Sequence, residues 1–449
     1  MNQTILIRNI RYLMVDEDPI RLSEPTDILI QGDRFSRIEP GILAPEADVV
    51  DGSDRYLLPG LIQTHVHLCQ TLFRSLADDV PLLMWLNQTI LPMESCHSYQ
   101  SLYWSSILGL AELIDSGTTT IVDMATNHHT DAVFQAMADM GIRGYSGKMM
   151  MDMARNPRAA GLVSETETAL DESLELMKQW HDYQNGRLQY ILNPRFAVTC
   201  SRSMLKSIGE FADHHQLMIH THASENTGEI ELIRQETGME NVEYLGNLGL
   251  LNSSLLLAHC IWLDDKEFDL IRQSGTTVLH CPSSNLKLGS GIAQVVRMMK
   301  MGIPVTLGAD GAACSNTLSI WNEIRSAALL QKVKLGPDAI RADDLLRMVT
   351  AIPARSLHRD HQIGRIAVGL KADAVILNPQ AGFSMQPFAE ERIASYLVYS
   401  ADPRQVESVL IDGVFRKRDF KLMMPCSYDH LISQVRQQLQ DVQRRCQLL

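Results

Sequence analysis

Between about Leu58 and Leu357, short apolar runs alternate with longer amphipathic stretches. The short runs have the length of buried strands, and stretches such as residues 101–117 (SLYWSSILGLAELIDSG) have helical spacing and end at a glycine. The pattern predicts eight strands, at residues 61–67, 119–125, 142–150, 188–196, 217–224, 255–260, 276–282 and 303–311. Repeated strand and helix is typical of a parallel α/β barrel, whose chemistry sits at the carboxyl ends of its strands.

The two ends of the chain have a different pattern, in which short β runs are separated by turn residues. These runs lie at residues 4–15, 26–40, 56–60, 363–379 and 406–420, and an amphipathic helix is predicted at 429–446. We therefore expect an α/β fold: a TIM-like (β/α)8 barrel with a small β-sandwich domain built from both chain ends. The expected units are residues 1–58 and 363–425 for the two parts of the β-sandwich, 59–362 for the barrel and 426–449 for the C-terminal helix.

Composition narrows the classes of protein and partner. The chain has 449 residues, 45% of them hydrophobic, which is enough for a barrel and a smaller companion. Its formal charge of -13 disfavours nucleic acid, because phosphate binding needs a basic surface. A small neutral or basic substrate fits better. The N-terminus has no secretory pattern, and no apolar run approaches the ~18 residues of a membrane span.

Cysteine usage agrees with a protein that works inside the cell. The eight cysteines are scattered without a C-x-x-C pair, so the sequence signals neither a disulfide framework nor a cysteine zinc site. We interpret them as buried apolar residues in a reducing compartment. The expected localisation is therefore cytoplasmic, with no membrane partner.

The stretch LLPGLIQTHVHLCQ (residues 57–70) ends an apolar run with two histidines one residue apart. Side chains alternate between the faces of a strand, so His65 and His67 point the same way. A short His-x-His pattern is weak by itself, because two satisfied histidines at a strand end would look the same.

Other predicted strands end in residues of matching chemistry. His222 lies near the end of LMIHTHAS with Glu225 three residues later, LLLAHC carries His259, and IPVTLGADG carries Asp310. Parallel strands of one barrel bring these ends to a single face. Zinc accepts imidazole nitrogen and carboxylate oxygen and keeps one position open for water in catalytic sites. Four such strand ends together predict a catalytic metal centre.

The sequence resembles the amidohydrolase superfamily, in the branch that holds guanine deaminases, adenosine-type nucleoside deaminases and s-triazine hydrolases. The blocks that carry the resemblance are LPGLIQTHVH, SGTTTIVDM, HTHASEN, LLLAHC, HCPSSNLKLGSG, GADGA and IGRIAVGLKADAVIL. Together they extend over nearly the whole chain, and few motif sets are this specific.

This resemblance implies a metal site and its neighbours. The ligands that match the family are His65, His67, His222 and Asp310, and Glu225 and His259 match its proton-handling residues. Relatives with two metals bridge them through a carboxylated lysine on the fourth strand, and LQYILNPRFAVTCS contains no lysine. One divalent metal per chain is therefore expected, zinc first and iron as the alternative. Lys148, at the end of the third strand, leaves a second ion open, and His220 is expected to pack behind the ligands.

The residue types suggest a mechanism. A bound divalent metal lowers the pKa of its water to about 7. Asp310 would accept the proton of that water, Glu225 would protonate a ring nitrogen, and His259 would hold the attacking oxygen in line. The reaction expected is hydrolytic deamination, with Glu225, His259 and Asp310 as its catalytic residues.

Residues expected to bind the substrate point to two kinds of purine. Gln70 offers an amide suited to a purine or pterin edge, and Arg195 and Phe196 add a fork donor and a stacking face; this set is similar to guanine deaminases. Trp85 and Glu94 match a motif of the nucleoside deaminases in which the glutamate contacts ribose. Guanine deaminases carry a similar glutamate, and nucleoside enzymes tend to have histidine where Arg195 stands.

Three interpretations follow. The favoured one is a deaminase of a guanine-like base or an adenosine-type nucleoside, with water as co-substrate. An s-triazine hydrolase would use the same metal centre, and a catalytically inactive barrel acting as a binding protein is the third. The family resemblance implies a homodimer or larger assembly.

Overall fold

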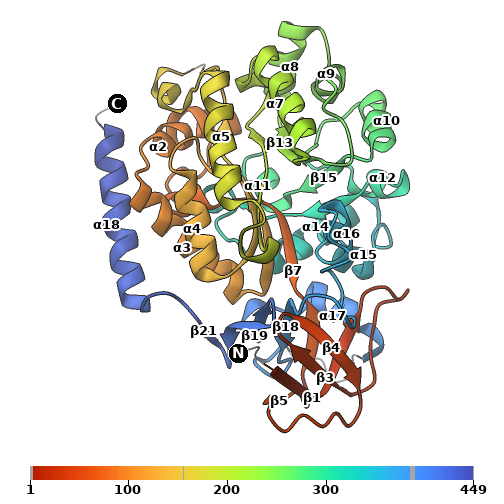
Figure 1. The fold of residues 1–449 in the computed structure, drawn as a ribbon. Helices are drawn as coiled ribbons and strands as arrows, with labels where there is room; N and C mark the ends of the chain where they lie inside the picture. Colours follow the sequence, from red (N-terminus) through yellow and green to blue (C-terminus); the bar gives the residue numbers. More distant parts are fainter. Residues whose placement is uncertain (1–3, 155, 385–389, 448–449) are drawn as a thin grey trace.

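The computed structural model describes residues 4–154, 156–384 and 390–447. Parallel sheets lie within a shell of helices, and a mixed sheet lies at one end of the molecule (Figure 1). The protein is therefore a mixed α/β structure with several sheets.

Each of the eight segments predicted as strands in the middle of the chain contains a strand. The principal strands are β7 (Leu61–His67), β8 (Thr118–Asp123), β9 (Arg143–Ser146), β11 (Leu188–Tyr190), β13 (Ile219–Ala223), β14 (Leu255–His259), β15 (Thr277–His280) and β16 (Val305–Leu307). Three segments add a short second strand: β10 (Met149–Met150), β12 (Asn193–Pro194) and β17 (Asp310–Gly311). Every residue of these strands is buried, as expected for sheets covered on both faces.

Most of the parallel strands form two sheets that adjoin each other, and β10 and β12 form a separate parallel pair. One of the two sheets has the order β11-β9-β8-β7-β17 and the other the order β13-β14-β15-β16. Bridges between Leu192 and Ile219 and between Phe196 and His222 connect the chain after β11 to β13. At the other side, β17 follows β16 and pairs with the end of β7. The carboxyl ends of both sheets therefore meet around one centre.

Helices follow most of these strands and surround the sheets (Figure 1). The longer ones are α3 (Tyr99–Asp115), α4 (Thr130–Met140), α5 (Thr166–Trp180), α7 (Arg202–His215), α8 (Thr227–Thr237), α10 (Asp265–Ser274) and α14 (Ile320–Leu335). Shorter ones are α1 (Leu82–Trp85), α2 (Leu91–Ser95), α6 (Tyr183–Gly186), α9 (Asn241–Asn247), α11 (Pro282–Lys287), α12 (Val295–Lys300), α13 (Ala312–Ser315), α15 (Ala342–Arg347) and α16 (Ala351–Ser356).

Local sequence explains where α10 begins and ends. The Asp264 side chain accepts a hydrogen bond from the backbone N–H of Glu267, whose side chain accepts one from the backbone N–H of Asp264. Gly275 follows the last turn with a φ of +72°, a conformation that glycine adopts without steric cost.

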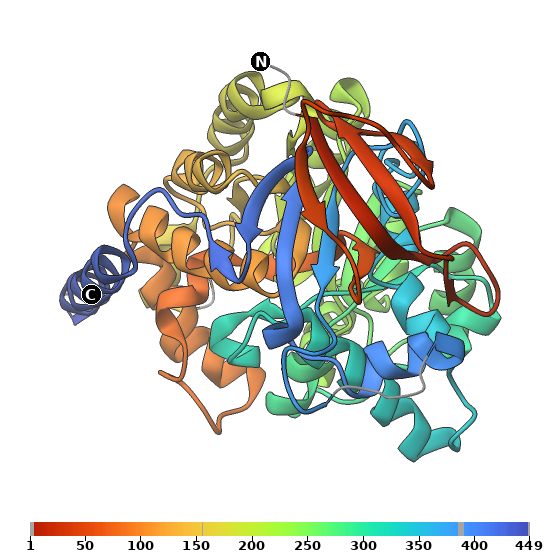
Figure 2. The same ribbon diagram turned by 90° about the horizontal axis from the view of Figure 1, so that it is seen from below.

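The mixed sheet combines strands from both ends of the chain. Its order is β21-β20-β19-β18-β6-β1-β3-β4, and β2 and β5 pair with β1. The bounds are β1 (Thr4–Met14), β2 (Arg21–Leu22), β3 (Thr26–Gln31), β4 (Arg34–Glu39), β5 (Asp48–Asp51), β6 (Tyr56–Pro59), β18 (Ala374–Leu377), β19 (Val406–Ile411), β20 (Val414–Arg418) and β21 (Lys421–Leu422). In Figure 2 the strands of the first segment, in red, and of the last, in blue, lie side by side.

Two parts of the fold differ from the sequence prediction. The β run expected at residues 363–379 contains a strand only at Ala374–Leu377, and helix α17 (Ile393–Tyr399) follows before β19. Residues 82–95 form two short helices joined by a π-helical turn at Leu86–Ile90, which the apolar pattern did not indicate. Both segments are irregular in hydrophobic spacing, so periodicity carries little information there.

The C-terminal helix α18 (Tyr428–Gln447) was predicted, and it lies along the flank of the molecule against α3 (Figure 1). Six of the eight cysteines are buried, whereas Cys426 and Cys446 are only partly covered, which corrects the expectation that all are buried. Within the ranges described, no helix has both the length and the apolar composition needed to cross a membrane.

Candidate metal centre and substrate cavity

The histidines and the aspartate predicted from the strand ends lie together in the structure. His65 and His67 come from β7, His222 from β13, His259 ends β14, and Asp310 begins β17. All five side chains are buried. Alternation along β7 and the parallel arrangement of neighbouring strands account for this convergence.

The nitrogen atoms of the histidines surround the Asp310 carboxylate. Asp310 Oδ1 lies 3.4 Å from His65 Nε2 and 3.4 Å from His67 Nε2. His67 Nε2 lies 3.2 Å from His222 Nε2. The three nitrogens of His65, His67 and His222 fall within the span of one metal site, and so do groups of His65, His259 and Asp310.

Hydrogen bonds on the far side of two rings fix their tautomers. His67 Nδ1 lies 2.9 Å from the Met124 carbonyl oxygen, and His222 Nδ1 lies 2.7 Å from the Arg195 carbonyl oxygen. A carbonyl only accepts, so both Nδ1 atoms carry the proton and both Nε2 atoms present lone pairs. Two lone pairs facing each other at 3.2 Å repel unless a cation lies between them. This pair of rings fits a metal ion.

The charge states agree with metal ligation. Burial lowers the pKa of His67 to about 4 and lowers the pKa of His222 well below its usual value, so both rings are neutral. Burial acts to raise the pKa of Asp310, but the neighbouring His65, His67 and His259 outweigh it and hold that pKa well below its usual range. Neutral imidazoles with one carboxylate are a ligand set that zinc and iron accept.

Glu225 and His259 lie at the edge of this cluster. Glu225 Oε2 is 3.5 Å from His259 Nε2, which is 3.9 Å from Asp310 Oδ2. Burial, with the nearby Asp310 charge, raises the pKa of Glu225 well above its usual value. A raised pKa favours the protonated carboxyl, which is the form that can donate a proton.

The backbone at three of these strand ends is left-handed. The φ angles of Ser224, His259 and Asp310 are +52°, +73° and +62°. Non-glycine residues adopt this region at a cost of about 1–3 kcal/mol each, and such positions cluster at functional sites. The sharp turn at each strand end directs the side chains of His259 and Asp310 to the common centre.

Ser284 and Asn285 support the cluster, and sequence reasoning gave them no role. The Ser284 hydroxyl donates to Asp310 Oδ2 at 2.7 Å, and His259 Nδ1 lies 2.8 Å from Asn285 Oδ1. Both residues lie in the first turn of α11, which follows β15, within the block HCPSSNLKLGSG. The criterion that identified His259, a polar residue at a strand end, does not reach this pair, which lies four and five residues beyond the end of β15.

A small, narrow cavity lies beside the cluster. Four of the five predicted substrate-binding residues line it, together with members of the cluster and three leucines. The lining residues are His67, Gln70, Leu82, Trp85, Leu86, Arg195, Phe196, His222, Glu225, His259, Leu288 and Asp310. The Phe196 ring stacks on His222, with centroids 4.4 Å apart. Trp85, one of the lining residues, is part of the cavity wall.

Glu94, the fifth predicted substrate-binding residue, lies behind the cavity wall. Its Oε2 is 2.5 Å from Arg195 Nη1, its Oε1 is 3.2 Å from Arg195 Nη2, and Gln70 Nε2 donates to Oε1 at 2.9 Å. Glu94 and Arg195 are both buried. Among the described residues, Arg195 Nε, Trp85 Nε1 and Gln70 Oε1 have no hydrogen-bond partner, so residues of the wall carry two unpartnered donors and one unpartnered acceptor.

The remaining candidates lie away from the cluster. Lys148 Nζ is 2.6 Å from the Asn127 carbonyl oxygen and 2.6 Å from Glu172 Oε2, so this amine is held outside the ring of histidines. His128 and His129 are exposed, and Met149, Met150 and Met151 belong to the hydrophobic core. His220 contacts His65, in agreement with the expectation that it packs behind the ligands.

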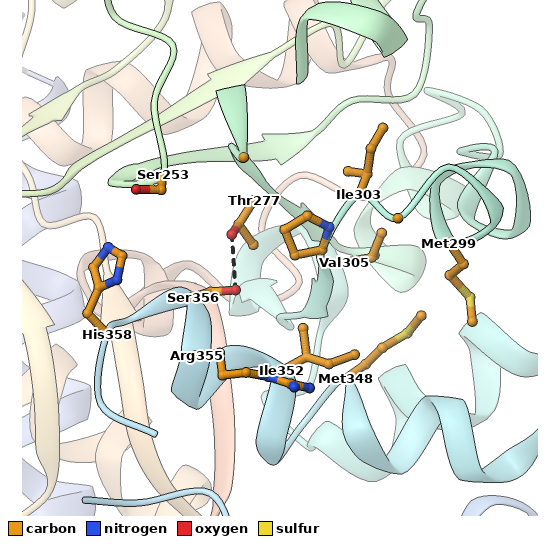
Figure 3. A pocket seen from close by; sticks show the side chains of 13 residues that line it. Ser253, Thr277, Met299, Ile303, Val305, Met348, Ile352, Arg355, Ser356 and His358 are labelled. Carbon is orange, nitrogen blue, oxygen red and sulfur yellow. Dashed lines mark hydrogen bonds between the residues drawn. The ribbon is translucent and has the colours of Figure 1, made fainter. Parts of the chain in front are cut away.

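A second pocket lies at the opposite, amino ends of β15 and β16 (Figure 3). Ile303, Val305, Ile352 and Met348 provide apolar walls, and a hydrogen bond joins Thr277 to Ser356. Figure 3 shows no converging set of acids and histidines in it. Chemistry in parallel α/β folds sits at the carboxyl ends of strands, so the histidine cluster is the better candidate.

Comparison with known proteins gives one family and several relatives. Residues 56–416 match the model of the amidohydrolase family. A 5'-deoxyadenosine deaminase of Methanothermobacter thermautotrophicus is 38% identical over 94% of this chain and 95% of its own length. A 5-methylthioadenosine/S-adenosylhomocysteine deaminase of Carboxydothermus hydrogenoformans is 36% identical over 91% of this chain and 92% of its own.

Solved structures are also similar over nearly the whole chain. An adenosine deaminase from Xanthomonas campestris with bound zinc has a TM-score of 0.89 and 27% identity, and the match covers 98% of both chains. An E. coli guanine deaminase has a TM-score of 0.82 and 25% identity over 92% of this chain and 98% of its own.

Proposed function

Because the chain belongs to the amidohydrolase family, we propose that it is a metal-dependent aminohydrolase acting on an aminated purine-type heterocycle. The reaction uses water, breaks the exocyclic C–N bond and releases ammonia. The observation that carries this proposal is the pair His67 and His222, whose lone pairs face each other beside a cavity lined by the buried Glu225.

The metal ligands in this proposal are His65, His67, His222 and Asp310, and they hold one divalent ion. Zinc is the first candidate because the similar adenosine deaminase structure contains it, and iron accepts the same ligands. A bound divalent ion supplies Lewis acidity and lowers the pKa of a water molecule to about 7.

Three side chains then move protons and orient the reactants. Asp310 accepts the proton of the attacking water as a C–O bond forms at the amino-bearing ring carbon. Glu225 donates its proton to the adjacent ring nitrogen, which makes that carbon more electrophilic. Glu225 then takes the remaining proton of the former water from the tetrahedral hydroxyl and carries it to the departing amine as the C–N bond breaks. The proton held by Asp310 finally restores Glu225 to its protonated form. His259, between Glu225 and Asp310, orients the attacking oxygen.

The proposal also includes the division of the chain into two domains. We assign the parallel sheets and their helices to a (β/α)8 barrel at residues 59–362, and the mixed sheet to a β-sandwich domain from residues 1–58 and 363–425.

A homodimer is proposed because Leu329, Val333 and Leu335 on α14 are exposed, Val333 to 88%. Light scattering tests this part, and a monodisperse monomer would contradict it.

An adenosine-type nucleoside is the first candidate substrate. The support is the 5'-deoxyadenosine deaminase and the 5-methylthioadenosine/S-adenosylhomocysteine deaminase, which match at 38% and 36% identity over almost the full length of this chain.

A guanine-like base is the second candidate, and one observation favours it. Arg195 occupies both oxygens of Glu94, so the carboxylate has little capacity left for the two hydroxyls of a ribose. The free Arg195 Nε donor and the free Gln70 Oε1 acceptor, unpartnered within the described ranges, match a ring carbonyl next to a ring N–H. That lactam edge occurs in guanine and pterins and is absent from adenosine.

A substrate panel separates these candidates. Ammonia release is measured with guanine, a pterin, adenosine, 5'-deoxyadenosine, methylthioadenosine, S-adenosylhomocysteine and melamine, and chloride release is measured with a chlorotriazine. Preference for the 5'-substituted nucleosides supports the first candidate, and preference for guanine supports the second. Activity confined to the triazines, or metal-loaded protein with no activity on any compound, would overturn the purine proposal.

A further inference from the structure

Asn193, in β12, has an amide whose orientation is fixed by two backbone oxygens. Its Nδ2 lies 2.9 Å from the Gly147 carbonyl oxygen and 3.2 Å from the Asp123 carbonyl oxygen. Both partners only accept, so the NH2 group must face them and Oδ1 must face the other way. The reversed amide would set an oxygen against two carbonyl oxygens in a fully buried place.

The polarity of the next two hydrogen bonds follows from this orientation. Asn193 Oδ1 lies 3.2 Å from His220 Nδ1, so His220 carries its proton on Nδ1 and presents a lone pair at Nε2. His220 Nε2 lies 2.7 Å from His65 Nδ1, so His65 in turn carries its proton on Nδ1. His65 Nε2 is left with a bare lone pair, 3.4 Å from Asp310 Oδ1 and without another partner within the described chain.

We propose that Asn193 and His220 are positioning residues that fix His65 in the tautomer able to bind a metal through Nε2. The inference rests on the metal centre of the proposed function and adds two residues to it. Neither residue touches the substrate cavity, so neither is a catalytic residue.

His65 differs from the other two histidines in how its tautomer is set. Backbone carbonyls of Met124 and Arg195 orient His67 and His222, and no substitution removes a carbonyl. His65 has no such carbonyl partner among the described hydrogen bonds and depends on two side chains. All three side chains of this relay are fully buried, so water has no access to replace a lost partner.

The affinity of the full-length apoprotein for Zn²⁺ tests the relay. It is measured by competition with a chromophoric chelator, together with the midpoint of thermal unfolding. His220→Phe removes the acceptor and leaves a buried donor on His65, so zinc binding should weaken by about 10–100-fold. His220→Gln can present its carbonyl oxygen to His65 Nδ1 and should stay within about threefold of the wild type.

His97→Phe is the matched control. His97 is also buried and has two hydrogen bonds, 2.8 Å to the Cys69 carbonyl oxygen and 3.0 Å to Ser101 Oγ. The His97→Phe variant should lower the unfolding midpoint as His220→Phe does and leave zinc affinity unchanged.

Asn193→Leu removes the hydrogen bond from His220 Nδ1 to Asn193 Oδ1. This variant should weaken zinc binding in the same range as His220→Phe, although His220 and His65 remain present.

The zinc affinities of these variants either support or overturn the relay from Asn193 through His220 to His65. A His220→Phe protein that binds zinc like the wild type overturns the relay, and so does equal weakening in His97→Phe. If His220→Phe does not fold, wild-type affinity in Asn193→Leu overturns it instead. Wild-type apoprotein that binds no zinc overturns the metal centre itself, whereas loss confined to His220→Phe and Asn193→Leu supports the relay.

Discussion

Two buried arginines with carboxylate partners lie at opposite ends of the parallel strands. Arg195 pairs with Glu94 behind the cavity at the carboxyl ends. Arg143, in β9, pairs with Asp373 and Asp412 where the parallel strands meet the mixed sheet. Their burial is nearly the same, since the Arg195 side chain is 2% exposed and the Arg143 side chain is 4% exposed.

Arg143 makes its hydrogen bonds to two carboxylates. Arg143 Nε and Nη2 contact Asp373 at 2.7 and 3.1 Å, and Nη2 also contacts Asp412. The backbone N–H of Asp412 donates to Asp373 at 2.8 Å. These residues join β9 to the segments beside β18 and β19, so the cluster holds the two parts of the molecule together.

The Arg195 pair leaves hydrogen-bonding capacity unused. Arg195 Nε and Gln70 Oε1 are unpartnered within the part of the chain that the structure describes, and both residues line the cavity. Burial and charge pairing are common to the two arginines. The difference is an unpartnered donor and an unpartnered acceptor on residues that line a cavity, and that difference indicates a binding role for one pair and a structural role for the other.

The largest effect is expected at the metal centre. Asp310→Asn removes a charged ligand and the proposed proton acceptor, so kcat should fall by about 1000-fold or more, roughly 4 kcal/mol in the barrier. Bound metal should fall from about one ion per chain, as measured by plasma emission. An active variant, or two tightly bound ions in the wild type, would contradict the single metal centre.

Arg143→Met tests the structural half of the comparison. It leaves Asp373 and Asp412 buried with one fewer cation, so the free energy of unfolding should fall by about 3–5 kcal/mol in urea titrations. Substrate preference of the folded protein should not change. Arg418→Met is the control: its pair with Asp48 is about one-third exposed and should contribute about 1 kcal/mol or less.

Arg195→Met tests the binding half. If Arg195 contacts the substrate, kcat/KM for the best substrate should fall, and the fall should correspond to a loss of about 2–4 kcal/mol of transition-state stabilisation. Glu94→Gln is informative beside it, because a contact between Glu94 and ribose would make this variant poorer on nucleosides than on free bases. Loss of stability in Arg195→Met with kcat/KM unchanged would give both arginines the same structural role.

Sequence patterns were sufficient for the strands and for the residues at their ends. All eight predicted segments contain strands, because buried parallel strands appear as continuous apolar runs. His65, His67, His222 and Asp310 converge because alternation and strand direction are local properties that the sequence records.

Long-range partners were not predictable in the same way. The pairing of Glu94 with Arg195 joins residues 101 positions apart, and nothing near either residue indicates it. The same holds for Asn193, which acquires its role from the carbonyls of Asp123 and Gly147. The helix at Ile393–Tyr399 was missed because a short apolar run fits a strand or a helix equally well.

Glu323 sharpens the comparison, because it is a buried carboxyl without a cation. Its Oε2 accepts from the Ser283 backbone N–H at 3.0 Å, and its Oε1 has no partner among the described residues.

Burial raises the pKa of Glu323 to about 7 from 4.5, so the folded protein keeps a proton that the unfolded chain releases between these values. Stability from this group is therefore present at low pH and is lost as pH rises toward 7, by about 2 kcal/mol between pH 5 and 7. The glutamine of the Glu323→Gln variant does not titrate. The drop in the free energy of unfolding between pH 5 and 7, measured by urea titration, should therefore be smaller in this variant than in the wild type by about 2 kcal/mol. Identical slopes in the two proteins would show that Glu323 is ionised throughout, and that a lone buried carboxylate is tolerated here as the paired ones are.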